Sequence, residues 1–138
     1  MSELNSSTIL IAGAGQLGSR YLQGLAKCQK TLDIYVQDIS EPSLQIARQR
    51  WEEVYQPASD FHDELTESAV QHNITFESSL EKIPKQIDIA VVATNADVRA
   101  QVVRQIVTNC EVRYWVLEKV LAQSGASLDE ILSLTQNS

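Results

Sequence analysis

Apolar residues along the chain fall into two patterns, short continuous runs and helical repeats. The runs predict strands at residues 8–12, 32–37, 73–77, 87–93 and 113–117. Between the runs, apolar positions recur three or four residues apart and predict helices at about residues 17–28, 41–55, 96–109 and 127–134. This alternation is typical of an α/β domain in which helices connect parallel strands.

Local residues set some of these boundaries and leave others open. Pro42 suits the first turn of its helix, and the Ser127–Glu130 spacing predicts a capping box for the last helix. Residues 56–73 are mostly polar, with a short helical possibility at 65–70, and predict an insertion between a helix and the third strand. His62 and His72 fall in this region and are expected at the surface, without a metal.

The turn after the first strand has the pattern Gly-x-Gly-x-x-Gly. Gly13 permits a tight turn, Gly15 leaves the backbone open to a pyrophosphate, and Gly18 lets the following helix pack close to the sheet. Glycines also serve ordinary turns, but here the pattern lies between an apolar strand and an amphipathic helix. The sequence therefore predicts a dinucleotide-binding loop made of Gly13, Ala14, Gly15, Gln16, Leu17 and Gly18.

The second predicted strand ends at Asp38, 20 residues after Gly18. A carboxylate there can accept hydrogen bonds from both hydroxyls of an adenosine ribose and would repel a 2′-phosphate. The next residues, Ile39, Ser40 and Glu41, include no arginine to neutralise such a phosphate, so NAD is expected as the cofactor rather than NADP. The alternative role for Asp38 is to cap the turn that follows it.

Right-handed crossovers and a nucleotide turn after the first strand predict a Rossmann-type sheet of order 3-2-1-4-5, with helices on both faces. Ligands of such sheets bind at the carboxyl ends of the strands, where the strand order reverses. Thr94 and Asn95 follow the fourth strand, and Glu118 and Lys119 follow the fifth. Thr94, Asn95 and Glu118 are predicted to contact the cofactor, although capping of the next helix is an equal alternative for Thr94 and Asn95.

Composition narrows the possible partners. The 138 residues fit one domain, and the 18 acidic against 11 basic residues give a net charge of −7, which disfavours nucleic acids and anionic membranes. No apolar run is long enough to span a bilayer, and we expect a cytoplasmic protein. Cys28 and Cys110 are predicted to be buried or half-buried thiols, and no disulfide or metal site is expected.

These motifs, in this order and spacing, resemble the Gfo/Idh/MocA family of glucose–fructose oxidoreductases and inositol dehydrogenases. The resemblance rests on the glycine turn, Asp38, Ala93-Thr94-Asn95 and Glu118-Lys119, and covers nearly the whole chain. It implies an oxidoreductase that uses a nicotinamide cofactor on a sugar, polyol or related metabolite, with Lys119 as the catalytic residue. Valine replaces the proline that usually follows the Glu-Lys pair, and Asn95 stands where proline is often found.

Family members carry a second domain after the cofactor domain, which supplies most of the substrate pocket and usually the oligomer interface. Residues 1–138 are therefore expected to be the cofactor domain of a longer dehydrogenase, inactive alone, with a homo-oligomer possible for the full-length protein. Two other classes share the glycine turn and the acid. A stand-alone NAD(H)-binding regulatory module would have no use for Lys119, and a methyltransferase would lack the Glu-Lys pair.

Overall fold

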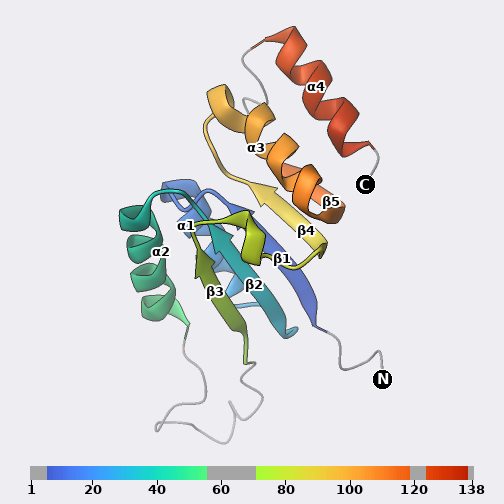
Figure 1. Cartoon of the computed structure of the whole chain (residues 1–138). Helices are drawn as coiled ribbons and strands as arrows, with labels where there is room; N and C mark the ends of the chain where they lie inside the picture. Colours follow the sequence, from blue (N-terminus) through green and yellow to red (C-terminus); the bar gives the residue numbers. More distant parts are fainter. Residues whose placement is uncertain (1–5, 56–70, 119–123, 137–138) are drawn as a thin grey trace, which may run out of the picture.

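The computed structural model describes residues 6–55, 71–118 and 124–136. They form a five-stranded, fully parallel sheet of order β3-β2-β1-β4-β5 (Figure 1). The strands are β1 (Ser7–Ala12), β2 (Leu32–Gln37), β3 (Asn73–Glu77), β4 (Gln86–Val92) and β5 (Glu111–Leu117). The predicted strands and their order are confirmed, with shifts of one or two residues at some ends.

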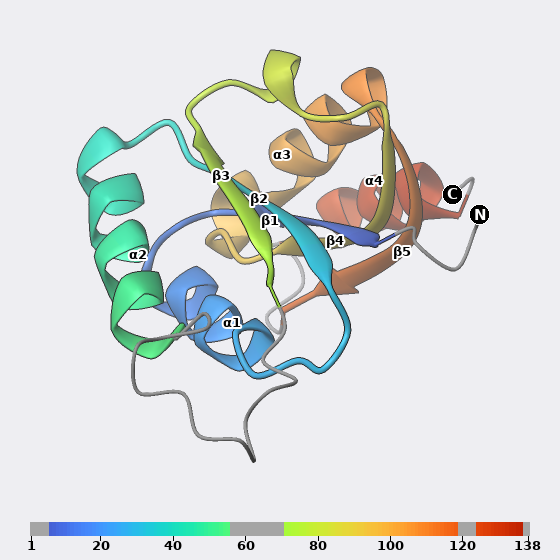
Figure 2. The same cartoon turned by 90° about the horizontal axis from the view of Figure 1, so that it is seen from below.

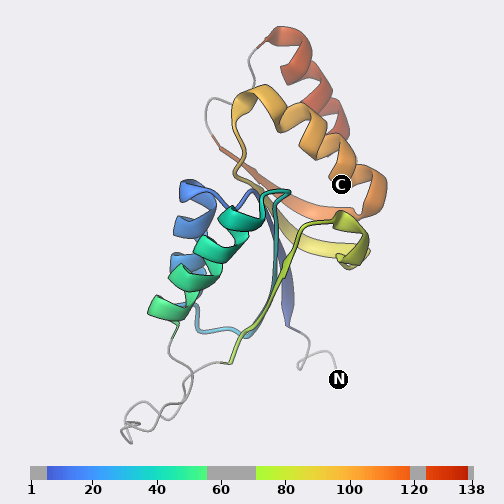
Figure 3. The same ribbon diagram turned by 60° about the vertical axis from the view of Figure 1, so that its left-hand side comes forward.

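Helices cover both faces of the sheet. The α-helices are α1 (Gln16–Leu25), α2 (Glu41–Val54), α3 (Ala96–Asn109) and α4 (Gly125–Thr135), and a 3-10 turn, η3 (Leu80–Lys82), precedes β4. Figures 2 and 3 show α1 and α2 on one face and α3 with α4 on the other, α4 lying along α3. This arrangement follows from the connection between β3 and β4, which passes β2 and carries the chain to the far side of β1.

Alternate residues of the central strand supply the two halves of the core. Ile9 and Ile11 are buried against α1 and α2, whereas Leu10 and Ala12 are buried against α3. A strand buried on both faces is apolar at successive positions. This is why runs of apolar residues in the sequence predict β1 and β4. The ladder pairs Ala12 with Gln37 on one side and Val92 on the other, so the carboxyl ends of three strands meet at one edge.

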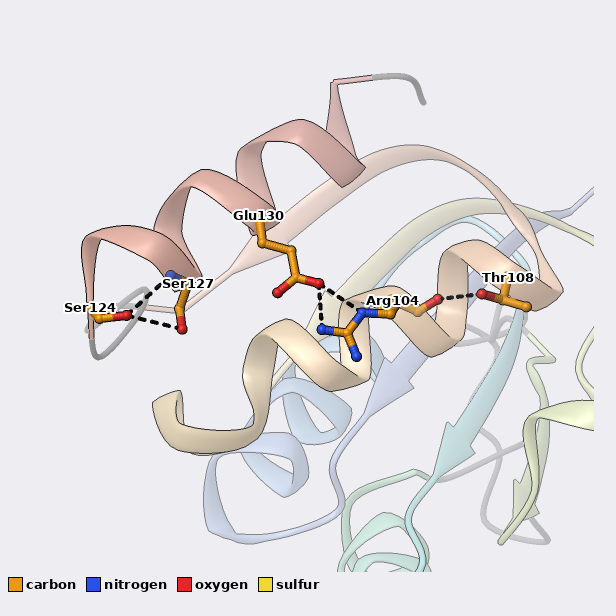
Figure 4. Close-up of polar contacts among 5 residues, drawn as sticks. All are labelled: Arg104, Thr108, Ser124, Ser127 and Glu130. Carbon is orange, nitrogen blue, oxygen red and sulfur yellow. Dashed lines mark hydrogen bonds and ion pairs between the residues drawn. The ribbon is translucent and has the colours of Figure 1, made fainter.

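Two predicted helix boundaries were wrong. The last helix begins at Gly125, where Ser124 is the N-cap and its hydroxyl accepts a hydrogen bond from Ser127 N (Figure 4). The cap therefore lies three residues before the predicted capping box, because Gly125 and Ala126 already continue the helix. The first helix likewise ends at Leu25, short of Cys28.

His72 is not at the surface: only 7% of it is exposed. Its Nδ1 accepts a hydrogen bond from Leu32 N at 3.1 Å, and its ring lies beside Tyr55 and Trp51, with centroids 5.5 and 6.1 Å away. Burial lowers the pKa of His72, although the carbonyl groups of Cys28 and Ala26 oppose that shift. Trp51 and Tyr55 lie at the end of α2. The polar sequence around His72 does not reveal that this helix end packs against it. His62 lies outside the described residues.

The cysteine prediction is confirmed: Cys28 is half-buried, Cys110 is buried, and both are free thiols. Burial raises the pKa of Cys110. Within the described residues, no three histidine, cysteine or acidic side chains gather as a metal site would require. None of the helices in that part of the chain is both long and apolar enough to cross a membrane.

Candidate nucleotide-binding site

The glycine turn is wedged between the ends of β2 and β4. Gly13 has a φ of +107°, which side chains rarely tolerate, and its N–H donates to Gln37 O at 2.8 Å. A Cβ at Gly13 would lie 3.0 Å from the carbonyl carbon of Ala93. At Gly18 a Cβ would lie 1.9 Å from Gly13 O, so this glycine allows α1 to start directly against the loop. Both residues are therefore required by the fold itself.

Gly15 differs from both. It is exposed, its backbone is extended with a φ of −73°, and a Cβ built on it would meet no heavy atom within 4 Å. Neither strain nor packing accounts for a glycine at this position. The open space beside it would let a pyrophosphate approach the backbone closely.

Two clefts open at this edge of the sheet and share four residues, Gly15, Ala93, Thr94 and Asn95. The Asp38 cleft, of about 400 Å³, is lined in addition by Gly13, Gln37, Asp38, Ile39, Val98, Gln101, Val102 and Gln105. The Arg99 cleft, of about 670 Å³, is lined in addition by Gln16, Leu17, Arg20, Ala96 and Arg99. Gly15 thus lies where the two clefts join.

The Asp38 carboxylate is held by the backbone on both sides. Oδ2 accepts from Ala14 N at 2.7 Å, and Oδ1 accepts from Ser40 N at 2.8 Å. The second bond is the turn-capping role considered above, and the first ties the carboxylate to the glycine loop. Each carboxylate oxygen can accept more than one hydrogen bond, so capping leaves acceptor capacity toward the cleft.

Thr94 and Asn95 form the wall between the clefts. Asn95 occupies the N-cap position of α3, but its side chain makes no capping hydrogen bond. The Thr94 hydroxyl is buried and has no hydrogen-bond partner among the described residues. Neither side chain caps α3, and the exposed Asn95 amide offers polar groups at the cleft wall.

Glu118 is held from both faces of the sheet. Its carboxylate accepts a hydrogen bond from the Tyr21 hydroxyl on α1, and this bond is the main cause of a raised Tyr21 pKa. Its carbonyl oxygen accepts from Arg99 on α3 at 2.7 Å. Glu118 is not among the described residues that line the two clefts. Lys119, the predicted catalytic residue, lies outside the described part of the chain.

The two clefts differ in charge. The Arg99 cleft contains Arg20 and Arg99 and no carboxylate among its described lining residues. The N-termini of α1 and α3 also meet there, and their free N–H groups favour anions. The Asp38 cleft contains a carboxylate beside the apolar side chains of Ile39, Val98 and Val102. One cleft suits an anion, and the other suits an uncharged polar ring system with hydroxyl groups.

The structure brings most of the predicted site residues together at the two clefts, namely Gly13, Gly15, Gln16, Leu17, Asp38, Thr94 and Asn95. Arg99, Ile39 and Gln101 also line these clefts and were not predicted from the sequence. Arg99 occupies a helical position between apolar residues, and an arginine there is ordinarily exposed. Its place in the first turn after Asn95, at the predicted ligand edge, was the available clue.

Solved structures with the same architecture include three dehydrogenases or reductases. A diketoreductase matches with 15% identity and a TM-score of 0.57, covering 95% of this chain and 46% of its own. (S)-3-hydroxybutyryl-CoA dehydrogenase from Ralstonia eutropha matches with 13% identity and a TM-score of 0.57, and the match covers 96% of this chain and 60% of that protein. The dehydrogenase part of a multifunctional enzyme from C. elegans matches with 18% identity and a TM-score of 0.54, and the match covers 95% of this chain and 29% of that protein.

These likenesses establish the class of fold: the chain is a Rossmann-type α/β domain. It spans less than two thirds of the length of each of these three proteins. No protein-family description and no curated protein matches the sequence.

Proposed function

We propose that residues 1–138 are the dinucleotide-binding domain of an NAD-dependent oxidoreductase. The observation that carries this proposal is Gly15, which has neither strain nor neighbours to explain it and lies where two clefts of different charge join. A dinucleotide has the matching form, two nucleoside halves on either side of a diphosphate.

The adenosine half belongs in the Asp38 cleft. Asp38 would accept hydrogen bonds from the ribose hydroxyls, while Ile39 and Val98, 88% and 40% exposed, offer apolar surface to the adenine ring. A 2′-phosphate would face the Asp38 carboxylate, with exposed Glu41 nearby in sequence. Preference for NAD over NADP follows from this charge.

The diphosphate belongs over Gly15, at the N-terminus of α1, and the nicotinamide half belongs in the Arg99 cleft. Bound nicotinamide supplies the chemistry of hydride transfer to or from a substrate carbon. The Asn95 amide, which is exposed and makes no capping hydrogen bond, is available to the ribose and phosphates between the two halves. The Thr94 hydroxyl lies buried beside it, without a hydrogen-bond partner among the described residues.

The reaction itself is proposed from the resemblance to the Gfo/Idh/MocA family and from the names of the structural neighbours, which are reductases or dehydrogenases. The substrate would be a sugar, polyol or related metabolite held by a second domain, and Lys119 would assist proton transfer beside the nicotinamide. Substitution Lys119→Ala in the full-length enzyme should lower hydride transfer by orders of magnitude and leave NAD affinity nearly unchanged. Unchanged turnover would remove Lys119 from the mechanism.

Thermal melting of the chain with NADH, NADPH and S-adenosylmethionine tests the proposed class. A ligand at 100 times its dissociation constant stabilises a fold by about 2.7 kcal/mol, enough to raise the melting temperature by several degrees. We expect a rise with NADH that saturates at lower concentration than any rise with NADPH. A rise with S-adenosylmethionine alone would instead indicate a methyltransferase, and no rise with either NADH or NADPH would refute the proposal.

A further inference from the structure

Arg99 is only 2% exposed, whereas every other described arginine is exposed or half-buried. Burial lowers the pKa of its guanidinium, and the Glu118 carboxylate opposes that shift. Arginine nevertheless stays protonated in proteins, so a cation lies inside the wall of the Arg99 cleft.

The guanidinium bridges the ends of two neighbouring strands. One terminal nitrogen donates to Thr94 O at 2.5 Å and the other donates to Glu118 O at 2.7 Å. The last ladder pair of β4 and β5 is Val92 with Leu117, so both carbonyl groups lie beyond the pairing of the sheet. A rigid, planar fork with donors on both sides sets the separation of two such carbonyls better than a single ammonium does.

Stability alone is a poor explanation for this arrangement. Arg99 lies in the first turn of α3, where the helix dipole is positive and a cation is unfavourable. An apolar side chain of similar volume often stabilises a buried site as well as a charged one does. A diphosphate in the adjoining cleft would make the position of this cation favourable. Its negative charge would lie close to the guanidinium and to the N-termini of two helices.

We infer that Arg99 is a positioning residue for the diphosphate and nicotinamide half of the dinucleotide. It holds the Thr94 carbonyl, which belongs to the wall of the Arg99 cleft, and ties that wall to the end of β5 through the Glu118 carbonyl. Its guanidinium also adds positive charge at the wall. The inference rests on the proposed function. It predicts a selective effect, because Arg99 lines the Arg99 cleft and is absent from the described lining of the Asp38 cleft.

Calorimetric titration of the chain with NADH and with AMP separates the two halves of the site. AMP carries only the groups assigned to the Asp38 cleft and one phosphate. The variants are Arg99→Lys, which keeps the charge and loses the fork, and Arg99→Met, which loses both. Arg104→Met is the matched control, since Arg104 lies on the same helix with an exposed side chain paired to Glu130 (Figure 4). Melting temperatures report the fold of each variant.

We expect Arg99→Lys to weaken NADH binding by at least about tenfold, or about 1.4 kcal/mol, and AMP binding by less than about twofold. Arg99→Met should lose more NADH affinity than Arg99→Lys, and Arg104→Met should match the parent for both ligands. Should Arg99→Met fail to fold, the folded Arg99→Lys variant still decides the matter.

Equal losses for AMP and NADH in Arg99→Lys would show a merely structural role and overturn the inference. Unchanged NADH affinity in that variant, or the same selective loss in Arg104→Met, would overturn it as well. A parent chain that binds neither ligand would refute the proposed function, and the inference would then fall with it.

Discussion

At the scale of single residues, the three glycines of the turn have different physical reasons. Gly13 is required by a positive φ and Gly18 by the carbonyl group of Gly13, whereas Gly15 faces open space. The sequence pattern predicted the tight turn at Gly13 and the close packing at Gly18, and the role of Gly15 beside a diphosphate stays a prediction. The spacing could predict these roles because each role follows from the geometry of a strand, a tight turn and a helix in succession.

The substitution Gly15→Val should leave the domain folded and abolish NADH binding. The valine side chain occupies the space assigned to the diphosphate, while the extended backbone at Gly15 accepts a side chain without strain. Gly24→Val is the matched control, since a Cβ there also meets nothing within 4 Å. Melting temperature and calorimetry check both variants. NADH affinity equal to that of the parent in Gly15→Val would show that the ligand does not approach this backbone.

The substitution Asp38→Asn should narrow the preference for NADH over NADPH. Asparagine keeps an acceptor for one of the two backbone N–H groups that Asp38 binds, loses the acceptor for the other, and removes the charge that opposes a 2′-phosphate. The measurement is the ratio of the two dissociation constants in parent and variant. A parent that binds both cofactors equally, or an Asp38→Ala variant that loses its fold rather than its ligand, would favour the turn-capping role alone.

At the scale of elements, the close contact between α1 and the glycine turn is a point of sensitivity. Substitution Gly18→Ala brings a Cβ within 1.9 Å of Gly13 O, which is backbone and cannot rotate away. Overpacking of this kind costs about 1–3 kcal/mol or more, and we expect a clear loss in chemical denaturation. A Gly18→Ala variant as stable as the parent would mean that α1 can shift away from the sheet without cost.

His72, which packs against the end of α2 just before β3, should make stability depend on pH. Burial depresses the pKa of His72, so below about pH 6.5 the unfolded chain binds a proton that the folded chain does not. The free energy of unfolding should therefore fall as the pH drops from 7 through 6.5 toward the lower pKa of the folded state. Urea denaturation between pH 7 and about 5.5 measures this before the ordinary range of carboxylates is reached.

In His72→Gln the slope with pH should flatten, because glutamine does not titrate and can still accept from Leu32 N. His62→Gln, which replaces the other histidine of the chain, shows how much of the pH slope comes from His62. A parental slope that survives His72→Gln and disappears in His62→Gln would contradict the assignment.

Elements with a hydrophobic pattern along most of their length were predicted well: β2, β3 and α3 have the predicted bounds, and β1 and β4 differ by one residue at one or both ends. β1 and β4 are buried on both faces, and their continuous apolar runs follow from that burial. His72, the Ser124 cap and Arg99 depend on partners distant in sequence or on one local hydrogen bond. Such partners leave no periodic pattern, so the burial of His72 and of Arg99 emerges only when the fold brings Trp51, Tyr55, Thr94 and Glu118 beside them.

At the scale of the whole molecule, the strand order explains why the site lies where it does. The chain crosses from β3 to the far side of β1, so the ends of β1 and β4 lie side by side and their connections leave toward opposite faces. Both clefts open at that divergence. The sequence predicted this edge from the order of elements and the Asp38 carboxylate on it, but it did not predict the arginines that make the other cleft cationic.

The structure of the chain in complex with NADH tests the proposed function most directly. We expect the diphosphate to lie against the backbone of Gly15, the adenosine ribose on Asp38, and the nicotinamide in the Arg99 cleft with Thr94 or Asn95 in contact with the cofactor. NADH bound elsewhere would contradict the proposal, for example in the cleft of about 570 Å³ at the opposite edge of the sheet, between Gln86 and Leu134.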